Sequence, residues 1–177
     1  MGFYVVVDLE NVQLSQPFKQ SELDFVCPAN TCIVGRIHTG DENGTTQFKY
    51  ARLIPDPNSG VVGAISLTNP MTTGNFRQSD FNYNAPSGYV ITGWQHSGDE
   101  NGNTSFQYSK VSFITAPATA SYNTDNSMVS ANIQESAGVW WTGQIMGELA
   151  QFLTGTSHDG DENGTTTYTG SLIWCNS

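Results

Sequence analysis

Three copies of one polar phrase are the residues of this chain best suited to chemistry. The phrase is His-x-Gly-Asp-Glu-Asn-Gly-x-Thr, and its copies run from His38 to Thr46, from His96 to Thr104 and from His158 to Thr166. Chance does not place Gly-Asp-Glu-Asn-Gly three times in 177 residues, so the chain is an internal triplication. Each copy joins an imidazole, two carboxylates, a carboxamide and a hydroxyl.

These side chains suit the recognition of sugar hydroxyls. A hydroxyl both donates and accepts, and a carboxylate or carboxamide can bridge two of them with strong, charge-assisted bonds. Three sites on one rigid body raise avidity, which is a reason to triplicate a binding loop but not a catalytic one. We therefore expect three quasi-equivalent sites that use the following residues: His38, Asp41, Glu42, Asn43, Thr46, His96, Asp99, Glu100, Asn101, Thr104, His158, Asp161, Glu162, Asn163 and Thr166.

An aromatic ring near the phrase adds a stacking surface for the apolar face of a sugar. Trp94 lies two residues before the second histidine and is the best candidate. The equivalent positions hold Arg36 and Thr156, so the three sites need not bind equally well.

The same phrase also has a purely structural interpretation. Asp, Asn and Gly are turn residues, so the copies can be well-formed hairpins and nothing more. Against this, Glu42, Glu100 and Glu162 are all kept although Glu is not a turn residue, and the outlying His and Thr are kept as well.

Metal binding is the main rival chemistry. The segment from Asp159 to Gly164 matches the opening of a calcium loop, but Thr39 and Ser97 replace its first Asp in the other copies. The closing Glu of an EF-hand would fall at Gly170, which excludes that motif. We expect no cofactor and assign no metal ligands. A Ca²⁺ site built from Asp and Glu stays open, as does a transition metal held by His and two carboxylates.

Catalysis is the weakest expectation, and we predict that the chain is not an enzyme. Neighbouring Asp and Glu at a hairpin tip point apart, whereas hydrolases take their two carboxylates from elements across a cleft.

The repetition extends beyond the phrase. The first two histidines are 58 residues apart and the next two are 62 apart. Phe18–Ser21 aligns with Phe76–Ser79, and Ile133–Ser136 is a weaker third copy of that element. We expect a single domain over 1–177, with internal repeats at approximately 1–58, 59–116 and 117–177, because units of this size bury little surface alone.

Alternation of apolar and polar residues on both sides of each phrase predicts strands. Thr46, Phe48 and Tyr50 share one face, as do the equivalent residues after the second loop. Each phrase then forms the tip of a hairpin, for which Asn-Gly is a strong signal. The predicted class is all-β, a pseudo-threefold β-prism-like domain, with a β-trefoil-like arrangement as the alternative.

The net charge of the chain limits the kinds of partner that it can bind. The net charge is −10 with only six Lys and Arg, which excludes nucleic acid and anionic membrane surfaces as partners. The sequence has no run of eighteen apolar residues, so we expect no insertion into a membrane. Glycans or glycoconjugates are the expected partners, and the oligomeric state stays open. Cys27 and Cys32 form either a disulfide or two buried thiols.

A triplicated polar loop in a small acidic all-β chain resembles the multi-repeat lectins, in which each repeat carries one sugar site. There is a looser resemblance to dermatopontin-type repeats, which pair an acidic loop with a following aromatic strand, although their Arg-x-Trp is missing here. The resemblance implies a multivalent, carbohydrate-binding lectin or adhesin domain, secreted or on a cell or virion surface, although no signal peptide is visible. The alternative is a metal-stabilised structural or receptor-binding surface domain of a virion, pilus or toxin.

Overall fold

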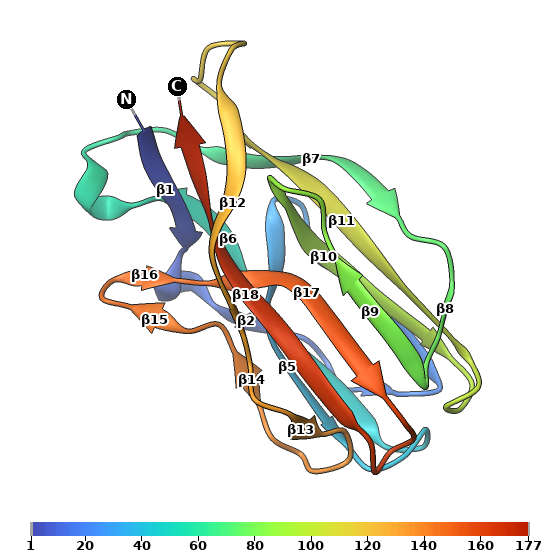
Figure 1. Ribbon diagram of the computed structural model, residues 1–177. Coiled ribbons are helices and arrows are strands. Elements are labelled where there is room, and N and C mark those ends of the chain that lie inside the picture. Colours follow the sequence, from blue (N-terminus) through green and yellow to red (C-terminus); the bar gives the residue numbers. More distant parts are fainter. Residues whose placement is uncertain (1, 177) are drawn as a thin grey trace.

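The computed structural model describes residues 2–176 and is all-β, as predicted, with 62% of the chain in strands. No α-helix occurs within those residues, and Figure 1 shows long strands running between two ends of the molecule. The first repeat contains β1 (Gly2–Val7), the 3₁₀ turn η1 (Leu9–Asn11), β2 (Gln13–Leu14), β3 (Phe18–Lys19), β4 (Glu22–Val26), β5 (Thr31–Thr39), β6 (Thr45–Pro55) and the 3₁₀ turn η2 (Pro57–Ser59). The second contains β7 (Ile65–Thr72), β8 (Phe76–Arg77), β9 (Asp80–Asn84), β10 (Tyr89–Ser97) and β11 (Asn103–Phe113). The third contains β12 (Ser121–Val129), β13 (Ile133–Gln134), β14 (Trp141–Thr142), β15 (Ile145–Met146), β16 (Leu149–Ala150), β17 (Phe152–Asp159) and β18 (Thr165–Asn176).

Three long antiparallel hairpins carry the phrases at their tips, which confirms that prediction. They are β5–β6, β10–β11 and β17–β18, and each pairs the histidine of a phrase with its threonine, as in His38 with Thr46. Each hairpin also shifts register next to a glycine at the same place, namely Gly35, Gly93 and Gly155. A bulge of this kind adds one residue to a strand and re-aims the side chains that follow it.

Each repeat contributes one strand to the sheet of the next repeat. The strand β4 pairs with β10 of the second repeat, β9 pairs with β17 of the third, and β14 pairs with β5 of the first. The exchange is cyclic, so the sheet around every hairpin is completed by a strand from the preceding repeat. This pairing brings the three phrase-bearing tips to the same end of the molecule, at the bottom of Figure 1.

The strand β1 joins two of these sheets into one. It pairs with both β6 and β18, which gives a curled sheet along the path β14-β5-β6-β1-β18-β17-β9, while β4-β10-β11-β7 forms a second sheet. The molecule therefore consists of several antiparallel sheets, one of them curled like half a barrel. The prism-like and trefoil-like descriptions stay predictions.

Two apolar clusters fill the interior. One lies around Phe3, Val34 and Phe152, and the other is aromatic and lies nearer the tips. In the second, Phe48, Phe106 and Tyr168 are buried at equivalent positions of the three hairpins. These residues belong to the strands that follow the phrases, which confirms the predicted alternation, and their role is packing.

Two local features refine the sequence analysis. The extra residues of the third repeat lie at the short hairpin β15–β16, which has Gly147 at a positive φ of 65°. Cys27, Cys32 and Cys175 are buried free thiols, so Cys27 and Cys32 are not bridged.

The second glycine of each phrase gives a direct test of how tightly the tips are packed. A Cβ on Gly44 would overlap the carbonyl oxygen of Thr39, whereas a Cβ on Gly74 would meet nothing within 4 Å. We expect Gly44→Ala to lower the free energy of unfolding by about 1–3 kcal/mol, the usual cost of overpacking, and Gly74→Ala to leave it nearly unchanged. Urea denaturation of both variants measures the difference, and equal stabilities would contradict this account of the tip.

Candidate functional site

Each tip is a four-residue turn from Asp to Gly. In the first copy the Gly44 N–H donates to the Asp41 carbonyl at 2.9 Å, and the Asp41 side chain accepts from the Asn43 N–H at 2.8 Å. The second and third copies make the same two bonds. The positive φ falls on Gly40 at 86° and not on Asn43 or Gly44. Asn-Gly therefore occupies the last two positions of the turn, and an Asp side chain supports it in the manner of an Asx-turn.

The histidine and threonine of each phrase lie behind the turn. The His38 Nε2 is 2.9 Å from the Gly40 carbonyl oxygen, and its Nδ1 is 2.8 Å from the Thr46 hydroxyl. His96 and His158 make equivalent contacts with Thr104 and Thr166. All six side chains are buried. This corrects their predicted role: the rings brace the loop and have no free nitrogen for a ligand.

A third buried residue joins the histidine and threonine behind each turn, and we call each such trio a brace. The sequence analysis did not identify this third residue as part of the site. Thr46 contacts the Gln20 carboxamide at 2.5 Å, Thr104 contacts Gln78, and Thr166 donates to the Glu135 carboxylate. These residues occupy the third position of the repeated Phe-x-Gln-Ser element, which lies before each phrase. That repetition was a signal in the sequence, although the third copy lies five residues farther from its phrase than the first two.

Hydrogen bonds between repeats close the three tips into a ring. The N–H of the first glycine of each phrase donates to the carbonyl of a serine in the preceding repeat, from Gly98 to Ser21 at 3.0 Å and from Gly160 to Ser79 at 2.9 Å. The third bond runs from Gly40 to Ser136 at 3.2 Å. The position of each loop is thus set by its neighbour as well as by its own hairpin.

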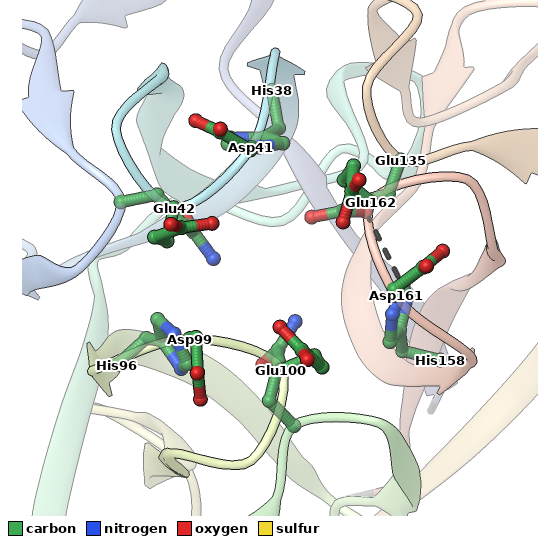
Figure 2. A pocket seen from close by; sticks show the side chains of 12 residues that line it. His38, Asp41, Glu42, His96, Asp99, Glu100, Glu135, His158, Asp161 and Glu162 are labelled. Atoms are coloured by element: carbon green, nitrogen blue, oxygen red, sulfur yellow. Dashed lines mark ion pairs between the residues drawn. The ribbon is translucent and has the colours of Figure 1, made fainter.

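The three tips surround a single hollow, shown in Figure 2, whereas the sequence predicted three separate sites. Its empty space is about 310 Å³ including the part open to solvent, and only about 30 Å³ is available to the centre of a water-sized sphere. The aspartates are exposed and the glutamates half-buried. The residues that line it are Gln20, His38, Asp41, Glu42, Gln78, His96, Asp99, Glu100, Glu135, His158, Asp161 and Glu162.

The asparagines stand at the outer edge of the tips. Asn43, Asn101 and Asn163 are exposed, and each side-chain amide lies 3.3 to 3.4 Å from the glutamate carboxylate beside it. Arg77 also donates to the Asn101 side-chain oxygen at 2.5 Å. Of the predicted contacts, the Asp, Glu and Asn of each copy remain accessible.

Trp94 does not lie where a sugar can stack on it. Its side chain is 1% exposed and is packed in the aromatic cluster, with the Arg36 guanidinium 4.4 Å from the ring centroid. The reason is that the re-aimed strand after the bulge turns this position inward in all three hairpins, so Arg36 and Thr156 are buried as well. The stacking prediction for Trp94 is wrong.

Arg36 and Glu135 form a buried ion pair under the hollow. Arg36 Nη2 donates to Glu135 Oε1 at 2.8 Å, and Nη1 donates to the Tyr168 hydroxyl at 2.7 Å. Burial opposes both charges, yet Arg36 lowers the pKa of Glu135 to about 2, and Glu135 keeps the pKa of Arg36 above its usual value. The pair joins the first repeat to the third.

Proton counting separates the third brace from the other two. Glu135 is a carboxylate, so Thr166 must donate to it, and the single hydroxyl proton of Thr166 is then unavailable to His158. The His158 ring lies 2.8 Å from the Thr166 hydroxyl and 2.9 Å from the Gly160 carbonyl oxygen, as in the other two tips. A glutamine at the equivalent position can donate instead, so His38 and His96 need only the Nε2 proton.

The described residues 2–176 contain no cluster of three or more His, Cys, Asp or Glu placed to hold a metal ion. In the same part of the chain, no helix is long and apolar enough to cross a membrane.

Histidine protonation provides one test of this arrangement. We expect long-range ¹H–¹⁵N spectra at neutral pH to show His38 and His96 with a proton on Nε2 alone, because Nε2 donates to a carbonyl oxygen and burial lowers the pKa of both rings. A proton on Nδ1 of either ring would contradict this arrangement.

The dependence of the free energy of unfolding on acidic pH provides a second test of this arrangement. Burial lowers the pKa of His38 and His96 below 6.5, and Arg36 lowers that of Glu135 from 4.5 to about 2 despite its burial. A depressed folded pKa means stability that is complete above the unfolded value and is lost as the pH falls. We therefore expect the free energy of unfolding, measured by urea denaturation, to decrease as the pH falls below 6.5, because the histidines protonate in the unfolded chain. It should decrease again between pH 4.5 and 2, by an amount on the order of 3 kcal/mol. A midpoint that stays constant through this range would contradict the burial of these groups.

Comparisons with protein-family models, with curated proteins and with solved structures gave no match to this chain. The functional argument therefore rests on the geometry of the three tips.

Proposed function

We propose that this chain is a non-catalytic carbohydrate-binding domain, a lectin or adhesin, whose binding surface is the ring of three phrase-bearing tips. The observation that carries the proposal is the convergence of three identical acidic, amide-bearing turns on one hollow. Identical side chains from three distant segments meet there at one surface, which a set of ordinary hairpins would not require.

The accessible groups match what sugars offer. Once the braces are made, each tip still presents one aspartate oxygen, a half-buried glutamate and an exposed asparagine. Carboxylates accept from hydroxyls in strong charge-assisted bonds, and a carboxamide can both donate and accept. The bracing behind them holds these groups in place before a ligand arrives, which lowers the entropic cost of binding.

The geometry favours one composite site over three independent ones. The hollow offers only about 30 Å³ to the centre of a water-sized sphere, which is too little to enclose a sugar ring, so a bound ring lies across the tips and contacts more than one of them. No Phe, Tyr or Trp lines the hollow, so the bound sugar is held by polar contacts without ring stacking. The expected stoichiometry is then one glycan for each chain, and avidity requires several chains.

A second candidate function is a rigid structural or receptor-binding tip of a larger surface assembly. The observation that favours it is the extent of the bracing, because both ring nitrogens of every histidine and one oxygen of every phrase aspartate are used within the protein. Such a domain presents the tips to a protein surface and has no glycan partner.

Glycan binding distinguishes these two functions. We expect signals on a glycan array and, by calorimetry with the best glycan, a stoichiometry near one for each chain. The paired change Asp99→Asn and Glu100→Gln should weaken binding at least tenfold because it removes two charged acceptors while keeping the turn, and Glu10→Gln, on η1, should have no effect. An array without signals would exclude the lectin function, and a stoichiometry of three would exclude the composite site.

A further inference from the structure

A polar groove lies beside the second tip, on the sheet formed by β4, β10 and β11. Its empty space is about 530 Å³ including the part open to solvent. About 270 Å³ of the groove is available to the centre of a water-sized sphere, against about 30 Å³ in the hollow between the tips. Ligand sites in proteins typically measure about 300–1,000 Å³. The groove can therefore seat a sugar ring, which the hollow cannot enclose.

The groove and the hollow meet at the second phrase. His96 borders both spaces. Ser97 and Asn103, which lie opposite each other on the two sides of the second turn, line the groove. A ligand that lies across the tips can therefore continue over the second turn into the groove.

A row of hydrogen-bonded side chains crosses the three strands along the groove. Gln95 Nε2 donates to Asp24 Oδ1 at 2.8 Å, and the Ser105 hydroxyl donates to Gln95 Oε1 at 3.0 Å. Within residues 2–176, the bond from Gln95 is the only hydrogen bond of the Asp24 side chain. The row thus holds the Asp24 carboxylate in place and leaves its Oδ2 to a ligand.

The rest of the lining is polar and accessible. Asn75, Ser97 and Asn103 are exposed and offer two carboxamides and a hydroxyl. Among the residues that line the groove, Leu23 alone is apolar, and it is 2% exposed. Sugar hydroxyls both donate and accept, which suits carboxylate, carboxamide and hydroxyl partners, whereas an apolar side chain of a peptide would find almost no apolar surface here.

The equivalent faces of the other two repeats are built differently. In the sheet around the first hairpin, the equivalent positions hold Ile37 and Trp140, and the Lys49 ammonium lies 4.5 Å from the centroid of the Trp140 ring. In the sheet around the third hairpin, the Ser157 hydroxyl is bonded to that of Thr167. The row of carboxylate, carboxamide and hydroxyl belongs to the second repeat, so a ligand that uses it has one orientation on the ring of tips.

Charge limits the class of sugar that fits this surface. Asp24 lines the groove, three aspartates and three phrase glutamates line the hollow, and no Lys or Arg is among the lining residues of either space. The carboxylate or sulfate of an acidic sugar would meet like charges here without a cation to offset them. A neutral sugar has no such repulsion.

We propose that the ligand is a neutral oligosaccharide of at least two sugar units, with one unit across the three tips and the next in the groove on β4, β10 and β11. This inference rests on the proposed glycan-binding function and names the class of glycan. Asp24 accepts from hydroxyls of the second unit, and Asn103 donates to them or accepts from them.

Calorimetry with glycans of different length tests the proposal. The probes are the neutral glycan with the strongest array signal and the same glycan shortened to two units and to one. We expect the two-unit probe to bind at least tenfold more tightly than the one-unit probe, because only the longer probe reaches the groove. Equal affinities would overturn the proposal and leave the glycan-binding function intact, whereas an array without signals would remove both.

Acidic forms of the same glycan test the predicted charge class. Sialylated or sulfated forms should give weaker array signals than the neutral glycan, because they bring a negative charge to a surface without cations. Equal or stronger signals from the acidic forms would overturn the assignment to neutral glycans.

Two matched double variants locate the second sugar unit. Asp24→Ala with Asn103→Ala removes two exposed side chains from the groove, and Asn82→Ala with Thr165→Ala removes the exposed side chains at the equivalent positions of the third repeat. We expect the first variant to weaken binding of the two-unit probe at least tenfold without a change for the one-unit probe, and the second variant to change neither. Melting temperatures verify that both variants fold. Equal affinities of the two variants for the two-unit probe would overturn the assignment of the second unit to the groove.

Discussion

The buried Arg36–Glu135 pair is the interaction on which the geometry of the three tips depends. It joins the first repeat to the third, and Trp94 of the second repeat packs against the guanidinium, so all three repeats meet at one charge. Glu135 also holds the brace of the third tip through Thr166. A buried pair of this kind adds little net stability compared with apolar packing, yet removal of one partner typically costs about 3–5 kcal/mol. Its contribution is to fix one arrangement of the repeats.

The pair also breaks the equivalence of the repeats. Where the first and second repeats have Gln20 and Gln78, the third has Glu135, and only the first has an arginine facing it. The visible surface of the tips stays nearly identical because the difference lies one layer deeper. Repeated loops can thus keep the same outer groups while the interior that supports them adapts to a single partner residue.

The sequence predicted the all-β class, the three hairpins and the position of each phrase, because alternating side chains and turn residues are local signals. The cyclic exchange of β4, β9 and β14 could not be predicted, since it depends on which strand edges meet after folding. The same limit explains the errors at the site. The bulge at Gly93, which turns Trp94 inward, has no local sequence signal, and the bonds of the histidines to backbone carbonyls have none either.

The pairing of the first and last strands has a consequence for the chain as a whole. Gly2 lies opposite Asn176 in adjacent strands, and Figure 1 shows both ends of the chain away from the hairpin tips. A peptide bridge of a few residues is therefore enough to join the two ends, and new ends could be opened in an exposed loop elsewhere. Reporter proteins or surface tethers attached next to Gly2 or Asn176 would project away from the acidic ring and leave it unobstructed.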